Sequence, residues 1–129
     1  MTTIYERIYK RLKNLGVLDL GTEAAKAKSG AFMDLSYDHL FKNDDGTFVI
    51  ALAHNYLQNG DVMPDPDMEI RVNPGAKMAE ALTLQDGFGY RQVYRGNKVD
   101  ARARYDLNKF LAYWLNNLRK QRFSFKGQA

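Results

Sequence analysis

The chain has 129 residues, of which 45% are hydrophobic and 26% charged, and it contains no cysteine. This length suits one domain, residues 1–129, with a single core, and the composition is that of a folded soluble protein. The absence of cysteine excludes disulfide bonds, thiolate metal sites and a cysteine nucleophile. No apolar run approaches the ~20 residues that span a bilayer, so we expect a cytoplasmic protein without a membrane partner.

The net charge of +4 is unevenly distributed along the chain. Ten lysines and arginines but only two acids fall between Arg91 and Lys126, so this third carries +8, whereas residues 1–90 carry −4. A basic segment can contact a phosphate backbone, because counterion release then drives binding. It can also be neutralised inside the fold by the acidic middle of the chain, and the modest overall charge favours this interpretation.

Residues 1–16 predict a helix. Thr3 and Glu6 have the spacing of a capping box, and Gly16 can end the helix. Residues 17–30 are small and polar, so we expect a connection there with at most one helical turn.

Residues 31–96 predict an antiparallel meander of about five strands, because apolar and polar residues alternate with a period of two. Turn sequences separate the strands at 43–46 and 73–75. Residues 47–57 are apolar on both faces, which is typical of a central strand. Gly87 and Gly89 indicate a tight turn rather than a nucleotide-binding loop, since no helix follows them.

Residues 106–121 predict a second helix, with Asp106 as its N-cap and an apolar stripe from Leu107 to Leu118. The preceding segment, 99–105, either extends the sheet or leads into this helix. Residues 123–129 form a basic tail that is a strand end, a nucleic-acid arm or a frayed terminus. These elements predict an α+β fold with both helices packed on one face of the sheet.

An acidic block in the middle of the chain is the first candidate site. Its possible metal ligands are His54, Asp61, Asp65, Asp67 and Glu69. Alternate residues of a strand share one face, so these carboxylates could bind a divalent cation that activates water for hydrolysis. Alternating carboxylates are also expected on the solvent-exposed face of a half-exposed strand, and we favour that interpretation.

His54 shares the apolar side of its strand with Leu52, which favours a structural histidine. A functional role would require an acidic partner, Asp61 or Asp65. None of the three serines lies in a nucleophile-elbow sequence, so a serine hydrolase is not expected.

The basic third of the chain is the second candidate site. Its possible nucleic-acid contacts are Arg91, Arg95, Arg102, Arg104, Arg119 and Arg122. Tyr90, Tyr94 and Tyr105 lie between them, and tyrosines among cations can stack on bases while the cations follow the phosphates. The alternation also allows the tyrosines to face the core while the arginines face water, and we favour this second arrangement.

Three stretches carry a resemblance to a known family: HNYLQNGDVMPDPDMEIRV, LTLQDGFGYRQVY and FLAYWLNNLRKQRF. The chain resembles, from about Phe32 to Phe123, a family of small bacterial domains of unknown function. The resemblance implies a plasmid or mobile-element setting, in which such domains occur alone or beside antirestriction-type modules. It implies no reaction and no catalytic residues.

We therefore expect a non-enzymatic binding or accessory module without a cofactor, whose partner is protein or nucleic acid. The alternative is a metal-dependent hydrolase that uses the acidic block. A homodimer formed through an uncovered sheet face or edge is a further possibility.

Overall fold

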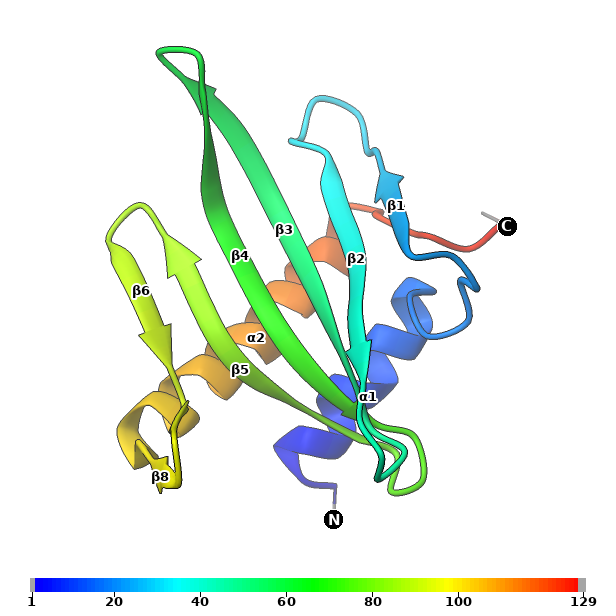
Figure 1. Ribbon diagram of the computed structural model, residues 1–129. Helices are drawn as coiled ribbons and strands as arrows, with labels where there is room; N and C mark the ends of the chain where they lie inside the picture. Colours follow the sequence, from blue (N-terminus) through cyan, green and yellow to red (C-terminus); the bar gives the residue numbers. More distant parts are fainter. Residues whose placement is uncertain (1, 128–129) are drawn as a thin grey trace.

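The computed structural model describes residues 2–127, apart from the side chains of residues 56–58 and 62–64. Its elements are α1 (Ile4–Leu15), β1 (Ala24–Ala27), β2 (Leu35–Lys42), β3 (Phe48–Gln58), β4 (Asp61–Asn73), β5 (Met78–Asp86), β6 (Gly89–Gln92), β7 (Tyr94–Arg95), β8 (Lys98–Val99) and α2 (Ala101–Lys120). Strands β1 to β6 form one sheet in sequence order, and β7 pairs with β8 (Figure 1).

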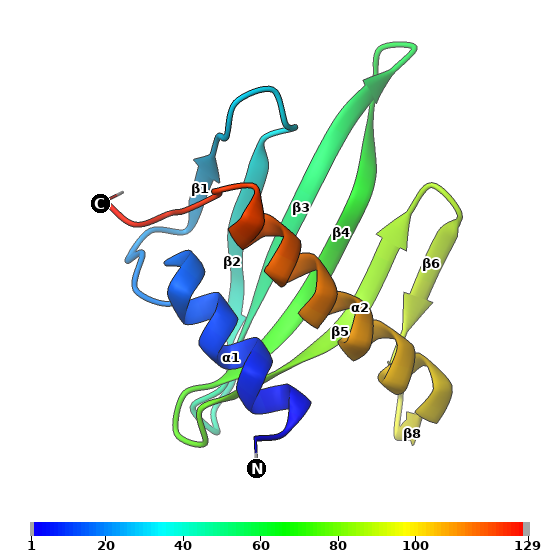
Figure 2. The same cartoon turned by 180° about the vertical axis from the view of Figure 1, so that it is seen from behind.

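The predicted α+β fold is confirmed. All neighbouring strands of the main sheet are antiparallel, and both helices lie on the same face of it (Figure 2). The main sheet has six strands rather than about five. Within residues 2–127, neither helix is long and apolar enough to cross a membrane.

The additional strand is β1, in a segment where the sequence predicts a connection. Its residues pair with β2 from Ala24 opposite Asp38 to Ala27 opposite Leu35. Alanine has little preference for strands, so the local sequence carries no signal for this element. The ladder to β2 and the burial of Ala27 override that weak propensity.

Helix α1 begins and ends as the sequence predicts. The backbone N–H of Thr3 donates to the Glu6 carboxylate at 3.0 Å, and the N–H of Glu6 donates to the Thr3 hydroxyl at 3.2 Å. Gly16 ends the helix with φ at +93°, a left-handed conformation that favours glycine. A Cβ at Gly16 would also lie 2.8 Å from the backbone nitrogen of Lys126. Both the left-handed backbone conformation and this steric clash therefore exclude larger residues at this position.

The core lies between the sheet and the two helices. Ile8 and Leu12 of α1 are fully buried, and so are Ile50, Met68 and Ile70 on the sheet. The apolar stripe of α2 packs against the same cluster. Because each helix turns its apolar stripe inward, its polar side forms the outer surface.

Helix α2 starts at Ala101, five residues earlier than the sequence pattern predicts. Its N-cap is Asp100, whose side chain accepts a hydrogen bond from the backbone N–H of Ala103 at 2.9 Å. Asp106, the expected N-cap, lies inside the helix and pairs with arginines instead. The segment 99–105 leads into the helix: Val99 ends β8, Asp100 caps α2, and residues 101–105 form its first turns.

The C-terminal tail belongs to the core up to Phe125. Phe123 and Phe125 are 4% and 0% exposed. The backbone N–H of Phe125 donates to the carbonyl oxygen of Leu15 at 2.8 Å, and its ring packs edge-on against Tyr37. Residues 123–127 form no strand, so the tail is not the strand end that was one of the three alternatives, and the burial of Phe123 and Phe125 argues against fraying of this segment.

We predict that Phe125→Ala lowers the free energy of unfolding by about 3–5 kcal/mol, because it removes a fully buried ring. Phe88→Ala is the control, since Phe88 is fully exposed and its removal should change stability by less than about 0.5 kcal/mol. Urea unfolding followed by circular dichroism measures both. Equal effects of the two substitutions would contradict the buried position of the tail.

Candidate functional site

A polar pocket of about 480 Å³ lies at the N-terminal half of β5. Here β5 has β4 on one side, whereas β6 pairs only with Thr83–Asp86 further along. The pocket is lined by Tyr5, Asp45, Thr47, Arg71, Asn73, Met78, Ala79, Glu80, Tyr94 and Arg104. Its walls therefore come from both helices, from β4 and β5, from β7 and from the turn before β3.

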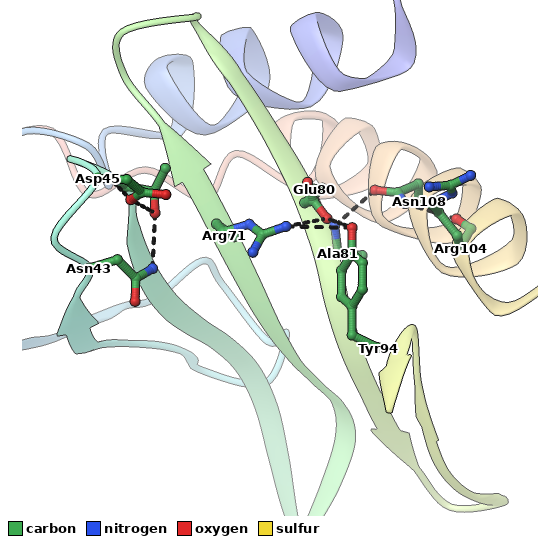
Figure 3. Close-up of polar contacts among 9 residues, drawn as sticks. Asn43, Asp45, Arg71, Glu80, Ala81, Tyr94, Arg104 and Asn108 are labelled. Carbon is green, nitrogen blue, oxygen red and sulfur yellow. Dashed lines mark hydrogen bonds and ion pairs between the residues drawn. The ribbon is translucent and has the colours of Figure 1, made fainter. Parts of the chain in front are cut away.

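Asn108 connects α2 to this edge of β5. Its side-chain oxygen accepts from the backbone N–H of Ala81 at 2.8 Å, and its amide nitrogen donates to the carbonyl oxygen of Arg104 at 2.8 Å (Figure 3). Asn108 is 2% exposed; its hydrogen bond to Ala81 is buried, and its bond to Arg104 is partly buried. It satisfies a strand N–H that β6 does not reach, and it fixes α2 beside β5.

Arg71, Glu80 and Tyr94 form the centre of the pocket. Arg71 and Glu80 are cross-strand partners, and their side chains make an ion pair at 3.1 Å. The Tyr94 hydroxyl donates to the same Glu80 oxygen, and the Arg71 guanidinium lies 5.2 Å from the centre of the Tyr94 ring (Figure 3). Burial, followed by the hydrogen bond to Glu80, raises the pKa of Tyr94 above its ordinary value, so the phenol stays protonated at neutral pH.

The opposite wall of the pocket is the turn before β3. Asp45 accepts from the backbone N–H of Thr47 at 2.9 Å and from its hydroxyl at 2.6 Å. Asn43 donates to the Thr47 hydroxyl at 2.9 Å. The hydrogen bonds from Thr47 hold the pKa of Asp45 below its ordinary value, so this carboxyl is ionised at neutral pH.

A second hollow of about 390 Å³ adjoins the pocket between α1 and α2. Its lining consists of Ile4, Tyr5, Arg7, Arg104, Tyr105, Asn108 and Lys109. Tyr5 and Arg104 line both spaces. The second hollow has three cations and no carboxylate in its lining, whereas the pocket contains the Arg71–Glu80 ion pair.

The structure does not bring the five predicted metal ligands together. His54 is buried on the helix side of the sheet, where Nδ1 lies 3.1 Å from the carbonyl oxygen of Asp34 and the ring packs against Trp114 and Phe123. Within the described part of the chain, no three histidine, cysteine, aspartate or glutamate side chains come close enough to share a metal ion.

The four carboxylates of the acidic block lie elsewhere. Asp61 and Asp65 are exposed along the β3–β4 hairpin, which extends beyond its neighbours in Figure 1. Asp67 and Glu69 alternate with the buried core residues of β4, so they point away from the helices. Burial, and then the charge of Asp38, raises the pKa of Asp67.

Two of the six predicted nucleic-acid contacts share one carboxylate, which offsets only half of their combined charge. Arg91 and Arg102 both pair with Asp106, at 3.2 and 3.1 Å. The hydrogen bond from Arg102 contributes most to lowering the pKa of Asp106.

The other four predicted arginines occupy different places. Arg104 lines both hollows, and Arg119 is exposed at the end of α2. Arg95 is exposed in β7, and Arg122 is exposed just after α2. Among the ion pairs found in residues 2–127, none joins this basic third of the chain to the acidic block.

Charge is segregated between the two layers of the fold. Helix α1 carries four basic residues and one acidic residue, and α2 carries five basic residues and one acidic residue, so the helix layer has a net charge of +7. Strands β2 to β5 carry seven acidic and two basic residues, a net charge of −5, and the whole six-stranded sheet, with Lys26 of β1 and Arg91 of β6, has a net charge of −3. This separation follows from the fold, because α1 and α2 are far apart in sequence but adjacent in space.

Sequence patterns do not single out the residues at the centre of the pocket. They place Arg71 only in an alternating strand, they name Tyr94 only as a possible base-stacking residue, and they mark neither Glu80 nor Asn108 as a site residue. The meeting of these residues depends on strand register and on the placement of α2, which a single sequence does not specify. Asn108 carries one usable signal, since it is an amide directly beside the apolar stripe of its helix.

The fold and the site together define a two-layer α+β protein with a basic helix layer and a polar pocket at a strand edge. Residues 3–124 match a family described as a domain of unknown function, DUF6908, and the chain belongs to this family. The match includes α1, which lies outside the region of our predicted resemblance. Comparisons with curated proteins and with solved structures found no match.

We predict that Asn108→Ala lowers the free energy of unfolding by about 1–3 kcal/mol, because it leaves the backbone N–H of Ala81 buried without its acceptor. Asn116→Ala on the same helix is the control, and its half-buried amide should matter by less than about 0.5 kcal/mol. Urea unfolding distinguishes the two. A loss no larger than that of the control would show that the bond to Ala81 contributes little.

We predict that Asp67→Asn stabilises the protein at pH 7 and not at pH 3. Because the pKa of Asp67 is higher in the folded than in the unfolded state, ionisation costs the folded state stability. That cost is absent below the unfolded pKa and fully present above the folded one. The gain should be below about 1 kcal/mol, since solvent screens the half-buried group.

Urea unfolding of the Asp67→Asn variant at the two pH values gives the comparison. Asp61→Asn is the control, because Asp61 is exposed and the same substitution there should leave stability unchanged at both pH values. A larger gain for Asp67→Asn at pH 3 than at pH 7 would reverse the sign and refute burial of the ionised carboxylate as the cause.

Proposed function

We propose that this protein is a non-enzymatic module that binds nucleic acid through its two-helix layer. The observation that carries the proposal is the separation of +7 on α1 and α2 from −5 on β2 to β5. A surface of one sign attracts a polyanion at long range, and each neutralised phosphate releases counterions. The acidic sheet would repel the same polyanion, so only one side of the molecule can bind it.

The helix layer presents its cations on a fixed frame. Both helices run in the same direction across the sheet (Figure 2), and the Arg11 guanidinium donates to the carbonyl oxygen of Ala112 at 2.6 Å. The exposed basic residues of the layer are Arg7, Lys10, Lys13, Arg102, Arg104, Lys109, Arg119 and Lys120. A rigid arrangement of this kind loses little entropy when it binds, because the backbone does not reorder.

Two tyrosines on the outer side of α2 add contact area among these cations. Tyr105 and Tyr113 are each 61% exposed, and Lys109 lies 5.6 Å from the centre of the Tyr105 ring. Exposed phenols can donate to phosphate oxygens or stack on unpaired bases. Of the six predicted arginines, Arg104 and Arg119 fit this surface best, because Arg91 and Arg102 share the charge of Asp106.

A nucleic-acid partner suits the bacterial mobile-element setting that the resemblance implies, and it suits a cytoplasmic location. The metal-dependent hydrolase is the less favoured alternative, because its five ligands lie on two faces of the sheet and along the hairpin.

We predict that the protein binds a 20-base-pair DNA duplex with an affinity that falls as salt rises. The double variant Lys10→Gln/Lys120→Gln should weaken binding at 50 mM salt and reduce the slope of log affinity against log salt by up to about 2, roughly one unit per lost phosphate contact. Fluorescence anisotropy over 50–200 mM salt measures both quantities.

The matched control is Lys42→Gln/Lys77→Gln, which removes the same charge from exposed residues of the sheet layer and its turns. This control should bind as the unmodified protein does. The proposal would be contradicted if the two double variants weakened duplex binding equally. It would also be contradicted if the protein showed no salt-sensitive binding of either single- or double-stranded nucleic acid.

A further inference from the structure

We infer that the pocket and the second hollow form one binding site for a mononucleotide, with its phosphate between α1 and α2 and its base beside Glu80. This site overlaps the nucleic-acid surface proposed above at Arg7, Arg104 and Lys109, but its pocket also takes residues from β4, β5 and β7, which lie outside that surface. It does not depend on that proposal, and separate residues test it.

The second hollow has the composition of a phosphate site. Arg7, Arg104 and Lys109 line it, and within the described residues none of the three forms an ion pair. The phenols of Tyr5 and Tyr105 line the same hollow. Three cations gathered without a carboxylate repel one another, and a phosphate dianion would relieve that repulsion while it accepts charge-assisted hydrogen bonds.

The pocket at β5 has a different composition, which suits an uncharged polar group. Arg71 is already paired with Glu80, so the pocket has less unbalanced charge than the hollow. Its lining combines the Asp45 and Glu80 carboxylates with the side-chain amide of Asn73, and Met78 and Ala79 contribute an apolar part. A nucleobase presents donors and acceptors along its edge and an apolar face, and this lining offers partners for each of them.

Tyr5 and Arg104 join the two spaces. Both residues line the pocket and the hollow, so a ligand that fills the two passes directly beside them. The charge of Arg104 is close enough to the Tyr94 hydroxyl to oppose the rise of the Tyr94 pKa. The volumes of about 480 and 390 Å³ are those of small-ligand sites, which span roughly 300–1,000 Å³.

Isothermal titration calorimetry with the full chain tests this site. The probes are the four 5′-ribonucleoside monophosphates, the corresponding nucleosides, ribose 5-phosphate and inorganic phosphate. At least one monophosphate should bind about tenfold or more tightly than its nucleoside, than ribose 5-phosphate and than inorganic phosphate, because only the nucleotide fills both spaces.

Variants then locate the phosphate. Arg7→Gln and Lys109→Gln, which change residues that line only the second hollow, should each weaken nucleotide binding about tenfold while leaving nucleoside binding unchanged. Lys120→Gln is the matched control, because it removes the same charge from α2 outside both hollows and should not alter nucleotide affinity. Circular dichroism shows whether each variant is folded, and because both altered residues are exposed we expect native spectra.

Three results would overturn the inference. They are the absence of binding by all four monophosphates, ribose 5-phosphate binding as tightly as the best nucleotide, and Lys120→Gln weakening nucleotide binding as much as Lys109→Gln does. Failure of the duplex-binding proposal would be seen separately, since Lys10→Gln/Lys120→Gln should alter duplex affinity without altering nucleotide affinity.

Discussion

The position of α2 against the edge of β5 is the constraint on which the site depends. The Asn108 side chain bonds at once to β5 and to the backbone of its own helix, so it fixes both the distance and the rotation of α2. Buried amides are rarely tolerated unless fully bonded, which makes this arrangement specific. The same contact brings Arg104 beside Tyr94 and leaves the outer side of α2 facing solvent.

The two layers of the fold have opposite charge because of the way helices and strands each expose one side. An amphipathic helix must turn its polar side outward, and the polar residues of α1 and α2 are mostly lysine and arginine. Strand β4 alternates, and its outward residues include Asp67, Glu69 and Arg71, whereas β3 presents Val49, Ala51 and Ala53 on the same side. A modest overall charge can therefore conceal two strongly charged faces, so net charge alone is a poor guide to the partner.

Much of the fold could be predicted from short-range patterns, and little of the site could. The capping box of Thr3 and Glu6 and the alternation in β4 are local signals, and the structure confirms them. Strand β1 escapes prediction because its alanines have no intrinsic preference for a sheet, and the start of α2 is predicted too late because Asp100 and Asp106 are equally good caps by composition. The Arg71–Glu80 pair requires the exact register of β4 and β5, which depends on tertiary packing.

The contact between Gly16 and the segment at Phe125 has a consequence for local unfolding of the protein. The end of α1 and the segment at Phe125 share a backbone hydrogen bond, and they leave no room for a side chain at Gly16. Proteolytic cleavage between α2 and Phe125 should therefore also loosen α1, a region more than a hundred residues away along the chain.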